Sequence, residues 1–343
     1  MTTISRHRAS NKTPILVGLS VSYQRDNLLA RGLGLEHLKE LLIRLGRPLL
    51  AQGVNLAYGG HWRDVEDNFT FDLLRLISSE QEDQNAANPD EEERPLGRLF
   101  NHCAWPLYFD ITPAVEAQWI NCCRIVRITQ QDAGFAGPDV VVDSEATQQT
   151  DRTLFNSAAT LSAMRRISMA GWTLPVPGRS RPESVPAIAA RVLLGGSIDG
   201  YSGWLPGIFE EALVTLERSA PLYLLGGFGG AAEVLARTLL DTAGARPPEF
   251  SEDWHRKCNP TLDRLLGLLP TYNLPLGIRT TQPALDALYS RIETGRANLS
   301  TTLGTGLDET ETREMLTTRD IKRAVQLVYK GLAAKFAFEK LSG

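Results

Sequence analysis

Three segments of the chain share one order: a short apolar run, a glycine pair, and then an amphipathic stretch. They cover residues 54–78, 190–218 and 222–240. Apolar runs of this length are typical of buried strands, whereas apolar residues at a spacing of three and four indicate helices. Strands that alternate with helices favour a parallel sheet covered by helices on both faces. The sequence therefore predicts an α/β fold with a doubly wound, mainly parallel sheet.

Further segments extend this pattern. Residues 15–23 and 121–130 are strand-like, and residues 35–53 and 153–170 have helical periodicity. We expect a flexible tail at residues 1–13, one α/β domain at 14–270 and a mostly helical extension at 271–343 packed on the core. Within the domain, the acidic residues 81–95 are expected to form an exposed loop, as is the Pro/Gly/Arg-rich segment 171–186.

Composition excludes several classes of protein. The net charge is −4, which argues against general nucleic-acid binding, since such binding depends on a basic surface. No apolar run approaches the ~18 residues of a membrane span, and the polar start lacks the apolar core of a signal peptide. The four cysteines have no CxxC spacing, and the five histidines have no HxH or HxxxH spacing. We expect a cytoplasmic protein with reduced thiols, no metal and no cofactor besides a nucleotide-type ligand.

The glycine-rich strand ends are the first candidate site. In a parallel sheet, ligands bind in the crevice beyond the carboxyl ends of the strands, where helix N-termini favour phosphate. The segment Gly226-Gly227-Phe228-Gly229-Gly230 stands at such an end. Its amides either cradle a phosphate or ribose, or its glycines serve a tight turn with positive φ. Both interpretations stay open, and we favour the ligand.

Other candidate residues follow the remaining strands. Of the adjacent Glu210 and Glu211, only one can readily face the crevice, because neighbouring helical residues point about 100° apart. Arg165 interrupts an apolar helix face, where it either reaches a phosphate or covers the core with its stem. The remaining candidates for ligand binding are Ser20, Ser22, Gly59, Gly60, Arg63, Gly195, Gly196, Asp199, Tyr201, Glu210 and Glu233.

The segment Gly226–Glu233 resembles the GGxGTxxE signature of the LOG family of nucleoside-monophosphate phosphoribohydrolases, with Gly230 in place of threonine. Arg165-Arg166-Ile167-Ser168-Met169 is similar to the RKxxM segment of that family, and Gly195–Gly203 is similar to its GGxxxGLMG turn. Tyr58-Gly59-Gly60 is the alternative position for that turn. Together these motifs resemble the broader SLOG (Smf/DprA–LOG) superfamily.

This resemblance implies a Rossmann-like domain that binds or senses a nucleotide-derived molecule, related to ADP-ribose or NAD. It also implies a role in prokaryotic nucleotide signalling or antiphage defence, as a homo-oligomer with a possible separate effector protein. The alternative is a LOG-like enzyme that cleaves or transfers at an N-glycosidic bond. In that case the resemblance assigns catalysis to Glu233 and Arg165.

Overall fold

The computed structural model describes residues 15–63, 65–87, 97–174, 183–241 and 244–338, so the tail predicted at residues 1–13 lies outside it. At its centre is a six-stranded sheet in the order β4-β3-β2-β1-β7-β8, and every neighbouring pair is parallel. The strands are β1 (Leu16–Ser22), β2 (Asn55–Tyr58), β3 (Leu99–Ala104), β4 (Cys123–Ile128), β7 (Ala190–Gly195) and β8 (Leu222–Leu225). The Rossmann-like α/β fold predicted from the sequence is confirmed.

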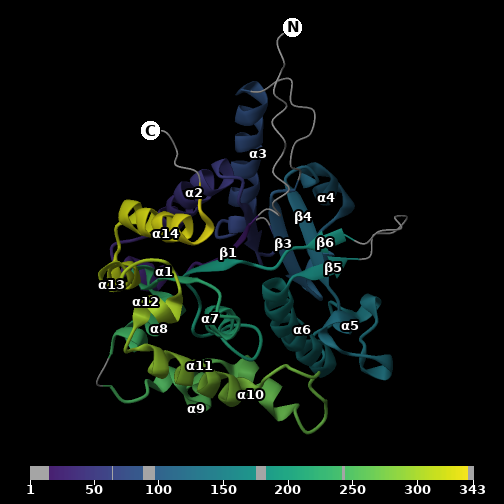
Figure 1. The fold of residues 1–343 in the computed structure, drawn as a ribbon. Helices are drawn as coiled ribbons and strands as arrows, with labels where there is room; N and C mark the ends of the chain where they lie inside the picture. Colours follow the sequence, from purple (N-terminus) through teal and green to yellow (C-terminus); the bar gives the residue numbers. More distant parts are fainter. Residues whose placement is uncertain (1–14, 64, 88–96, 175–182, 242–243, 339–343) are drawn as a thin grey trace.

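Helices cover both faces of this sheet. One face carries α2 (Leu35–Ala51), α3 (Phe69–Ala87) and α14 (Ile321–Phe336), and the other carries α6 (Asp151–Ala170) and α7 (Gly207–Glu217) (Figure 1). The chain first builds outward from β1 to β4 and then returns to place β7 on the other side of β1. Because crossovers between parallel strands are right-handed, reversing the direction of travel moves the connecting helices to the opposite face.

The strands are apolar on both faces, as a sheet covered on both sides requires. In β1, Val17, Leu19 and Val21 pack toward α2, whereas Leu16 joins the cluster beneath α6. The register pairs Leu19 with Tyr58 on one side and with Val192 on the other. Buried side chains therefore hold the sheet in place from both faces.

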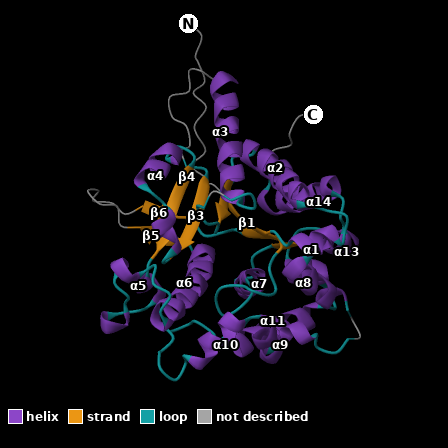
Figure 2. Ribbon diagram, turned by 180° about the vertical axis from the view of Figure 1, so that it is seen from behind, coloured by secondary structure: helices purple, strands orange, loops and turns teal. Residues whose placement is uncertain are grey.

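The remaining elements lie around this sheet (Figure 2). Two short strands pair antiparallel outside the main sheet, β5 (Trp172–Leu174) and β6 (Glu183–Val185). Other helices are α1 (Arg25–Leu29), α4 (Pro113–Trp119), α5 (Gln130–Ala133), α8 (Gly230–Leu240), α9 (Glu252–Cys258), α10 (Pro260–Gly267), α11 (Thr281–Gly295), α12 (Leu299–Leu303) and α13 (Glu309–Thr317). Single 3-10 turns are η1 (Leu107–Asp110), η2 (Gly137–Asp139), η3 (Asp143–Glu145), η4 (Gly226–Phe228) and η5 (Pro248–Phe250).

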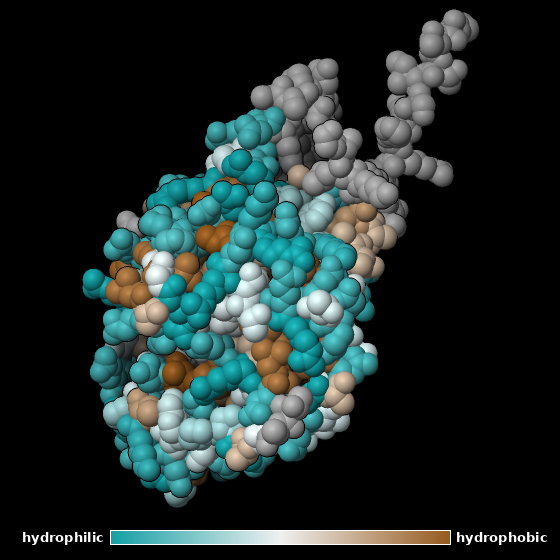
Figure 3. Space-filling model, turned by 90° about the vertical axis from the view of Figure 1, so that its left-hand side faces the viewer, coloured by the Kyte–Doolittle hydropathy of each residue, from teal (hydrophilic) through white to brown (hydrophobic). Residues whose placement is uncertain are grey.

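The helices after residue 271 are part of the core. Leu327 and Val328 of α14 belong to the same buried cluster as β1, and Tyr223 of β8 donates its hydroxyl to the carbonyl of Thr305 at 2.8 Å. On the face seen in Figure 3, hydrophobic residues form small patches separated by polar residues. Along the described part of the chain, no helix combines the length and apolarity needed to cross a bilayer.

Three local predictions need correction. Residues 81–87 of the expected acidic loop continue α3 as helix, and residues 88–95 lie outside the described residues. In the segment expected as a loop at 171–186, residues 172–174 form β5 and residues 183–185 form β6, whereas residues 175–182 lie outside the described residues. Strand β3, with the sequence LFNHCA, was not predicted, because Asn101 and His102 interrupt its apolar run although both are buried. Cys122 and Cys123 are buried, and both are free thiols, as expected for reduced cysteines.

Candidate functional site

The crevice at the carboxyl ends of β1 and β7 is the candidate site. These two strands flank the point where the strand order reverses, and ligands of open α/β sheets bind at such switch points. The cavity there has a volume of about 190 Å³. It is lined by Leu19, Ser20, Val21, Ser22, Tyr58, Gly59, Arg165, Gly196, Ser197, Gly207, Ile208 and Glu211.

Arg165 reaches the crevice from α6 and is held there by a carboxylate of α7. Its Nη1 donates to Glu210, and each of the two side chains is only 10% exposed. The Arg165 Nε is buried and has no hydrogen-bond partner within the described residues. A Cβ on Gly207 would lie 3.1 Å from Arg165 Nη2, so the missing side chain at this position leaves room for the guanidinium. A charged donor group is thus fixed at the crevice.

Helix α7 begins at the same place. Its N-cap, Pro206, offers no side-chain acceptor to the first N–H groups of the helix. Unsatisfied N–H groups at a helix N-terminus favour anions. Gly207 and Ile208, the first residues of α7, both line the crevice. The guanidinium of Arg165 and the start of α7 therefore both favour an anionic group.

A second buried ion pair lies beneath the crevice. Arg191 of β7 pairs with Glu211 at 3.2 Å and donates to the hydroxyls of Ser20 at 3.0 Å and Ser168 at 3.2 Å. Burial lowers the pKa of Arg191, and the neighbouring Glu211 opposes this effect. Sequence reasoning missed Arg191, although one arginine in the apolar run ARVLLGG was a signal for a buried charge.

The structure resolves the alternative between the two adjacent glutamates differently from our prediction. Glu211 lines the crevice, whereas the predicted ligand residue Glu210 faces Arg165. Neither is solvated, because Glu211 is 13% exposed and Glu210 is 10% exposed at the side chain. Each buried carboxylate is therefore stabilised by its paired arginine, Arg165 for Glu210 and Arg191 for Glu211.

Glycines shape the crevice at two strand ends. Gly196 has a φ of +94°, and a Cβ there would lie 2.3 Å from Ile208. Gly195 has a φ of +65°, and its Cβ would lie 2.6 Å from the carbonyl oxygen of Ser22. Gly59, which follows β2, also lines the crevice. Its neighbour Tyr58 lines the crevice as well, and burial raises the pKa of its phenol.

The polar residues after β1 connect to the turn after β7. Ser22 accepts the N–H of Ser197 at 3.2 Å, and Gln24 donates to the hydroxyl of Ser197. Gln24 also donates to Asp199 at 3.3 Å. The structure therefore brings Ser20 and Ser22 together with Gly196, and it connects Asp199 to this edge through Gln24.

The glycines at 226–230 divide into two groups with different surroundings. A Cβ on Gly226 would lie 2.6 Å from the Leu316 carbonyl oxygen, and one on Gly227 would lie 2.0 Å from that of Thr318. Phe228 is 1% exposed. The end of α13 thus packs directly on η4 and covers this part of the predicted cradle.

Gly229 and Gly230 instead bring α8 against the turn after β7. Their φ values are +83° and +65°, and a Cβ on Gly230 would lie 2.4 Å from the Gly196 carbonyl oxygen. Ala231 donates its N–H to that same oxygen at 2.9 Å. This close approach explains the glycines by packing and by positive φ.

The predicted residues Glu233, Tyr201 and Gly60 do not line the crevice either. Glu233, on α8, pairs with Arg31, which lies over Gly229. Tyr201 is 6% exposed and packs edge-on to His255. A Cβ on Gly60 would meet the ring of Tyr58 at 2.0 Å.

Arg63 lies in the loop after β2, where its Nε pairs with Asp110 at 2.9 Å. It lines a different cavity, together with residues of η1 and α6. Trp62 beside it is buried and donates to Asn101 at 2.9 Å, so this tryptophan is not free to stack on a base. Among the described residues, no group of three His, Cys, Asp or Glu side chains is placed to hold a metal ion.

Comparison with known proteins identifies one family that matches this chain. Among curated proteins, no match is found. The model of one protein family, described as SLOG cluster2, matches residues 11–176 and 178–315 of the chain. These residues include the whole sheet, Arg165, both glutamates of α7 and the glycine-terminated strands. The chain therefore belongs to the SLOG cluster2 family.

Proposed function

We propose that this protein binds a nucleotide-derived small molecule, related to ADP-ribose or NAD, in the crevice between β1 and β7. One observation carries the proposal: Arg165 and the uncapped start of α7 meet at the switch point of the sheet. A phosphate there would accept hydrogen bonds from the guanidinium and from the N–H groups of Gly207 and Ile208. Membership of the SLOG cluster2 family supports a nucleotide-related ligand.

The size of the crevice supports partial enclosure of the ligand. Its volume of about 190 Å³ is smaller than the roughly 300–1,000 Å³ of typical ligand pockets. We therefore expect one phosphate and its ribose to lie inside, with the rest of the ligand along the carboxyl edge of the sheet. Gly59 and Gly196 leave the backbone accessible to the enclosed part.

Binding without turnover fits the geometry better than cleavage at an N-glycosidic bond. The enzymatic alternative needs Glu233 and Arg165 at one ligand. Glu233 instead pairs with Arg31 and does not line the crevice, whereas Arg165 lines it and pairs with Glu210. Binding of a signalling nucleotide, with a role in prokaryotic nucleotide signalling or antiphage defence, is therefore the function we propose. A homo-oligomeric state, a separate effector protein and a cytoplasmic location stay predictions.

The test is calorimetric titration with ADP-ribose, NAD and cyclic ADP-ribose isomers. Loss of Arg165 alone would leave Glu210 buried and unpaired, so the informative variant is the double substitution Arg165→Gln with Glu210→Gln. Hydrogen bonds to charged groups contribute about 1.5–3 kcal/mol, which predicts a loss of affinity of at least about tenfold. The matched control replaces the exposed pair Arg44 and Glu40 of α2, 54% and 46% exposed, by glutamines.

Two results would contradict the proposal: no ligand of the panel binds at millimolar concentration, or the crevice variant binds as tightly as the control. Mass spectrometry of the titrated solution distinguishes binding without turnover from cleavage at an N-glycosidic bond. Release of a free base by the wild-type protein, abolished in Glu233→Gln, would favour that alternative.

A further inference from the structure

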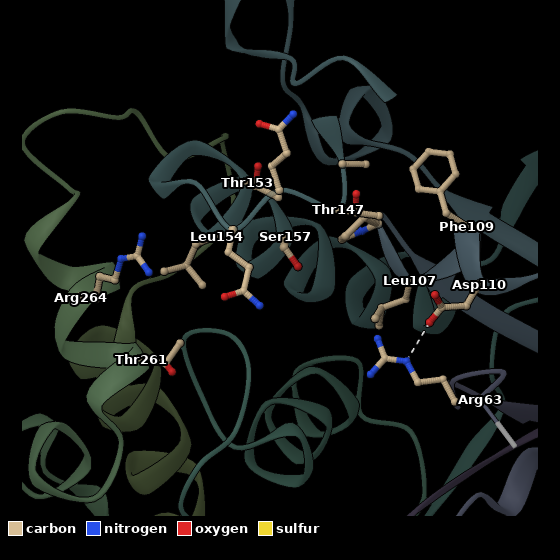
Figure 4. Close-up of a pocket in the computed structure, with 14 residues that line it drawn as sticks. Arg63, Leu107, Phe109, Asp110, Thr147, Thr153, Leu154, Ser157, Thr261 and Arg264 are labelled. Carbon is tan, nitrogen blue, oxygen red and sulfur yellow. Dashed lines mark hydrogen bonds and ion pairs between the residues drawn. The ribbon is translucent and has the colours of Figure 1, made fainter. Parts of the chain in front are cut away.

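A second and larger cavity lies beside the first turns of α6. Its volume is about 460 Å³, within the range of about 300–1,000 Å³ that is typical of small-molecule pockets. Its walls come from η1, the loop before α6, the start of α6, and α10 (Figure 4). None of its lining residues lines the crevice. We name it the Phe109 pocket.

One wall of the Phe109 pocket is apolar and aromatic. Phe109 is 41% exposed, although most large apolar side chains of this fold are buried. Leu107 and Pro106 continue the same wall. An exposed aromatic ring that faces a cavity provides a stacking surface for a planar ring.

The other walls carry uncharged polar groups. Ser157 of α6 and the amides of Gln148 and Gln149 line the cavity. Within the described residues, their side chains make no hydrogen bond to the protein. Hydroxyl and amide groups both donate and accept, which matches the mixed donor and acceptor edge of a nucleobase and the hydroxyls of a ribose.

Charges at the two ends of the pocket are internally neutralised. Figure 4 shows Arg63 at one end and Arg264 at the other. Arg63 pairs with Asp110 at 2.9 Å, and Arg264 pairs with Asp151 at 2.6 Å. Each guanidinium at an end of the pocket is therefore already held by a carboxylate. The two pairs connect the loop after β2 with η1, and α10 with α6.

We propose that the Phe109 pocket binds an uncharged nucleoside moiety, with its base stacked on Phe109 and its polar edge toward Ser157 and the two glutamines. This site is distinct from the crevice and does not depend on the function proposed for it. The crevice provides a guanidinium and a helix N-terminus for phosphate, whereas this pocket provides an aromatic wall and neutral polar groups.

The experiment compares adenosine with ribose 5-phosphate by calorimetric titration. Stacking of one base on an aromatic side chain contributes about 1–3 kcal/mol, which is a change in affinity of roughly fivefold or more. We therefore expect adenosine to bind the wild-type protein and to bind Phe109→Ala at least about fivefold more weakly. Ser157→Phe, which fills the pocket from α6, should lower the affinity as well. Leu276→Ala is the matched control, because Leu276 is 99% exposed and does not line the pocket.

The double variant of the crevice distinguishes binding in the Phe109 pocket from binding in the crevice. Adenosine affinity should be unchanged in Arg165→Gln with Glu210→Gln, whatever that variant does to ADP-ribose. The inference is overturned if adenosine fails to bind at millimolar concentration, or if Phe109→Ala and Ser157→Phe bind it like the control. It is equally overturned if the crevice variant abolishes adenosine binding, or if ribose 5-phosphate depends on Phe109 as adenosine does.

Discussion

The contact between η4 and the end of α13 makes Gly227→Ala a test of why this glycine is present. A Cβ at Gly227 would lie 2.0 Å from the carbonyl oxygen of Thr318 and 2.8 Å from that of Thr317. Both are backbone atoms, so no side-chain rotation relieves the overlap. The φ of Gly227 is not in the left-handed region, and steric overlap alone therefore decides the outcome. Either α13 or η4 must shift away.

The size of the effect follows from overpacking. Inserting a methyl group into a well-packed core costs about 1–3 kcal/mol. With an unfolding entropy of about 2.1 cal/mol/K per residue, a chain of 343 residues has about 0.7 kcal/mol/K in total. The melting temperature of Gly227→Ala should therefore fall by roughly 1–4 °C.

The assay pairs thermal denaturation, followed by circular dichroism, with titration of ADP-ribose into the folded variant. We expect a lower melting temperature and an unchanged affinity, because Gly227 does not line the crevice. Gly267→Ala in α10 is the control, since a Cβ there meets no atom within 4 Å and the helix should gain about 0.5–1 kcal/mol. An unchanged melting temperature together with a tenfold loss of affinity would refute this reasoning and restore the predicted phosphate cradle.

Three further predictions concern buried charges and Glu233. Burial lowers the pKa of His255 to about 4 and that of His102 to about 3. In the unfolded chain both histidines have a pKa near 6.5, so the unfolded state binds their protons first as the pH falls. The free energy of unfolding should therefore decrease between about pH 6.5 and 4.5, by up to about 2–3 kcal/mol per histidine. Urea denaturation at a series of pH values measures this decrease. Arg191→Met leaves Glu211 unpaired and should cost about 3–5 kcal/mol of unfolding free energy, most of it recovered in the double variant with Glu211→Gln. Glu233→Gln should leave ADP-ribose affinity within about twofold of wild type, and a tenfold loss would place Glu233 at the ligand.

The fold was largely predictable because local pattern and overall architecture agree. The segments at 54–78, 190–218 and 222–240 each contain the predicted strand and helix, and the parallel sheet follows from their alternation. Strand β3 was missed for a physical reason. Asn101 is fully buried because it accepts from Trp62 and donates to the carbonyls of Tyr58 and Gly60, contacts that sequence periodicity cannot show.

The candidate site was predictable only in part. Ser20, Ser22, Gly59, Gly196 and Arg165 line the crevice, as expected for residues that follow strands or interrupt an apolar helix face. The prediction also placed the ligand on Gly226–Gly230. Within this segment, Gly226 and Gly227 lie against the backbone of residues 316–318, some ninety positions later in the chain, and no local pattern reveals which distant backbone will cover a turn.

The two ion pairs at the crevice explain why adjacent glutamates occur at the start of α7. Glu210 holds Arg165 of α6, while Glu211 holds Arg191 of β7, so one helical turn fixes two arginines from different elements. Burying either arginine without its glutamate would be strongly unfavourable. The two ion pairs balance the charges and hold both arginines in place before a ligand binds. In the proposed binding mode, the phosphate therefore meets a fixed guanidinium and a fixed helix N-terminus. In this binding mode, such preorganisation reduces the entropy lost on binding, and we expect the Glu210–Arg165 pair to determine affinity as a unit rather than through either residue alone.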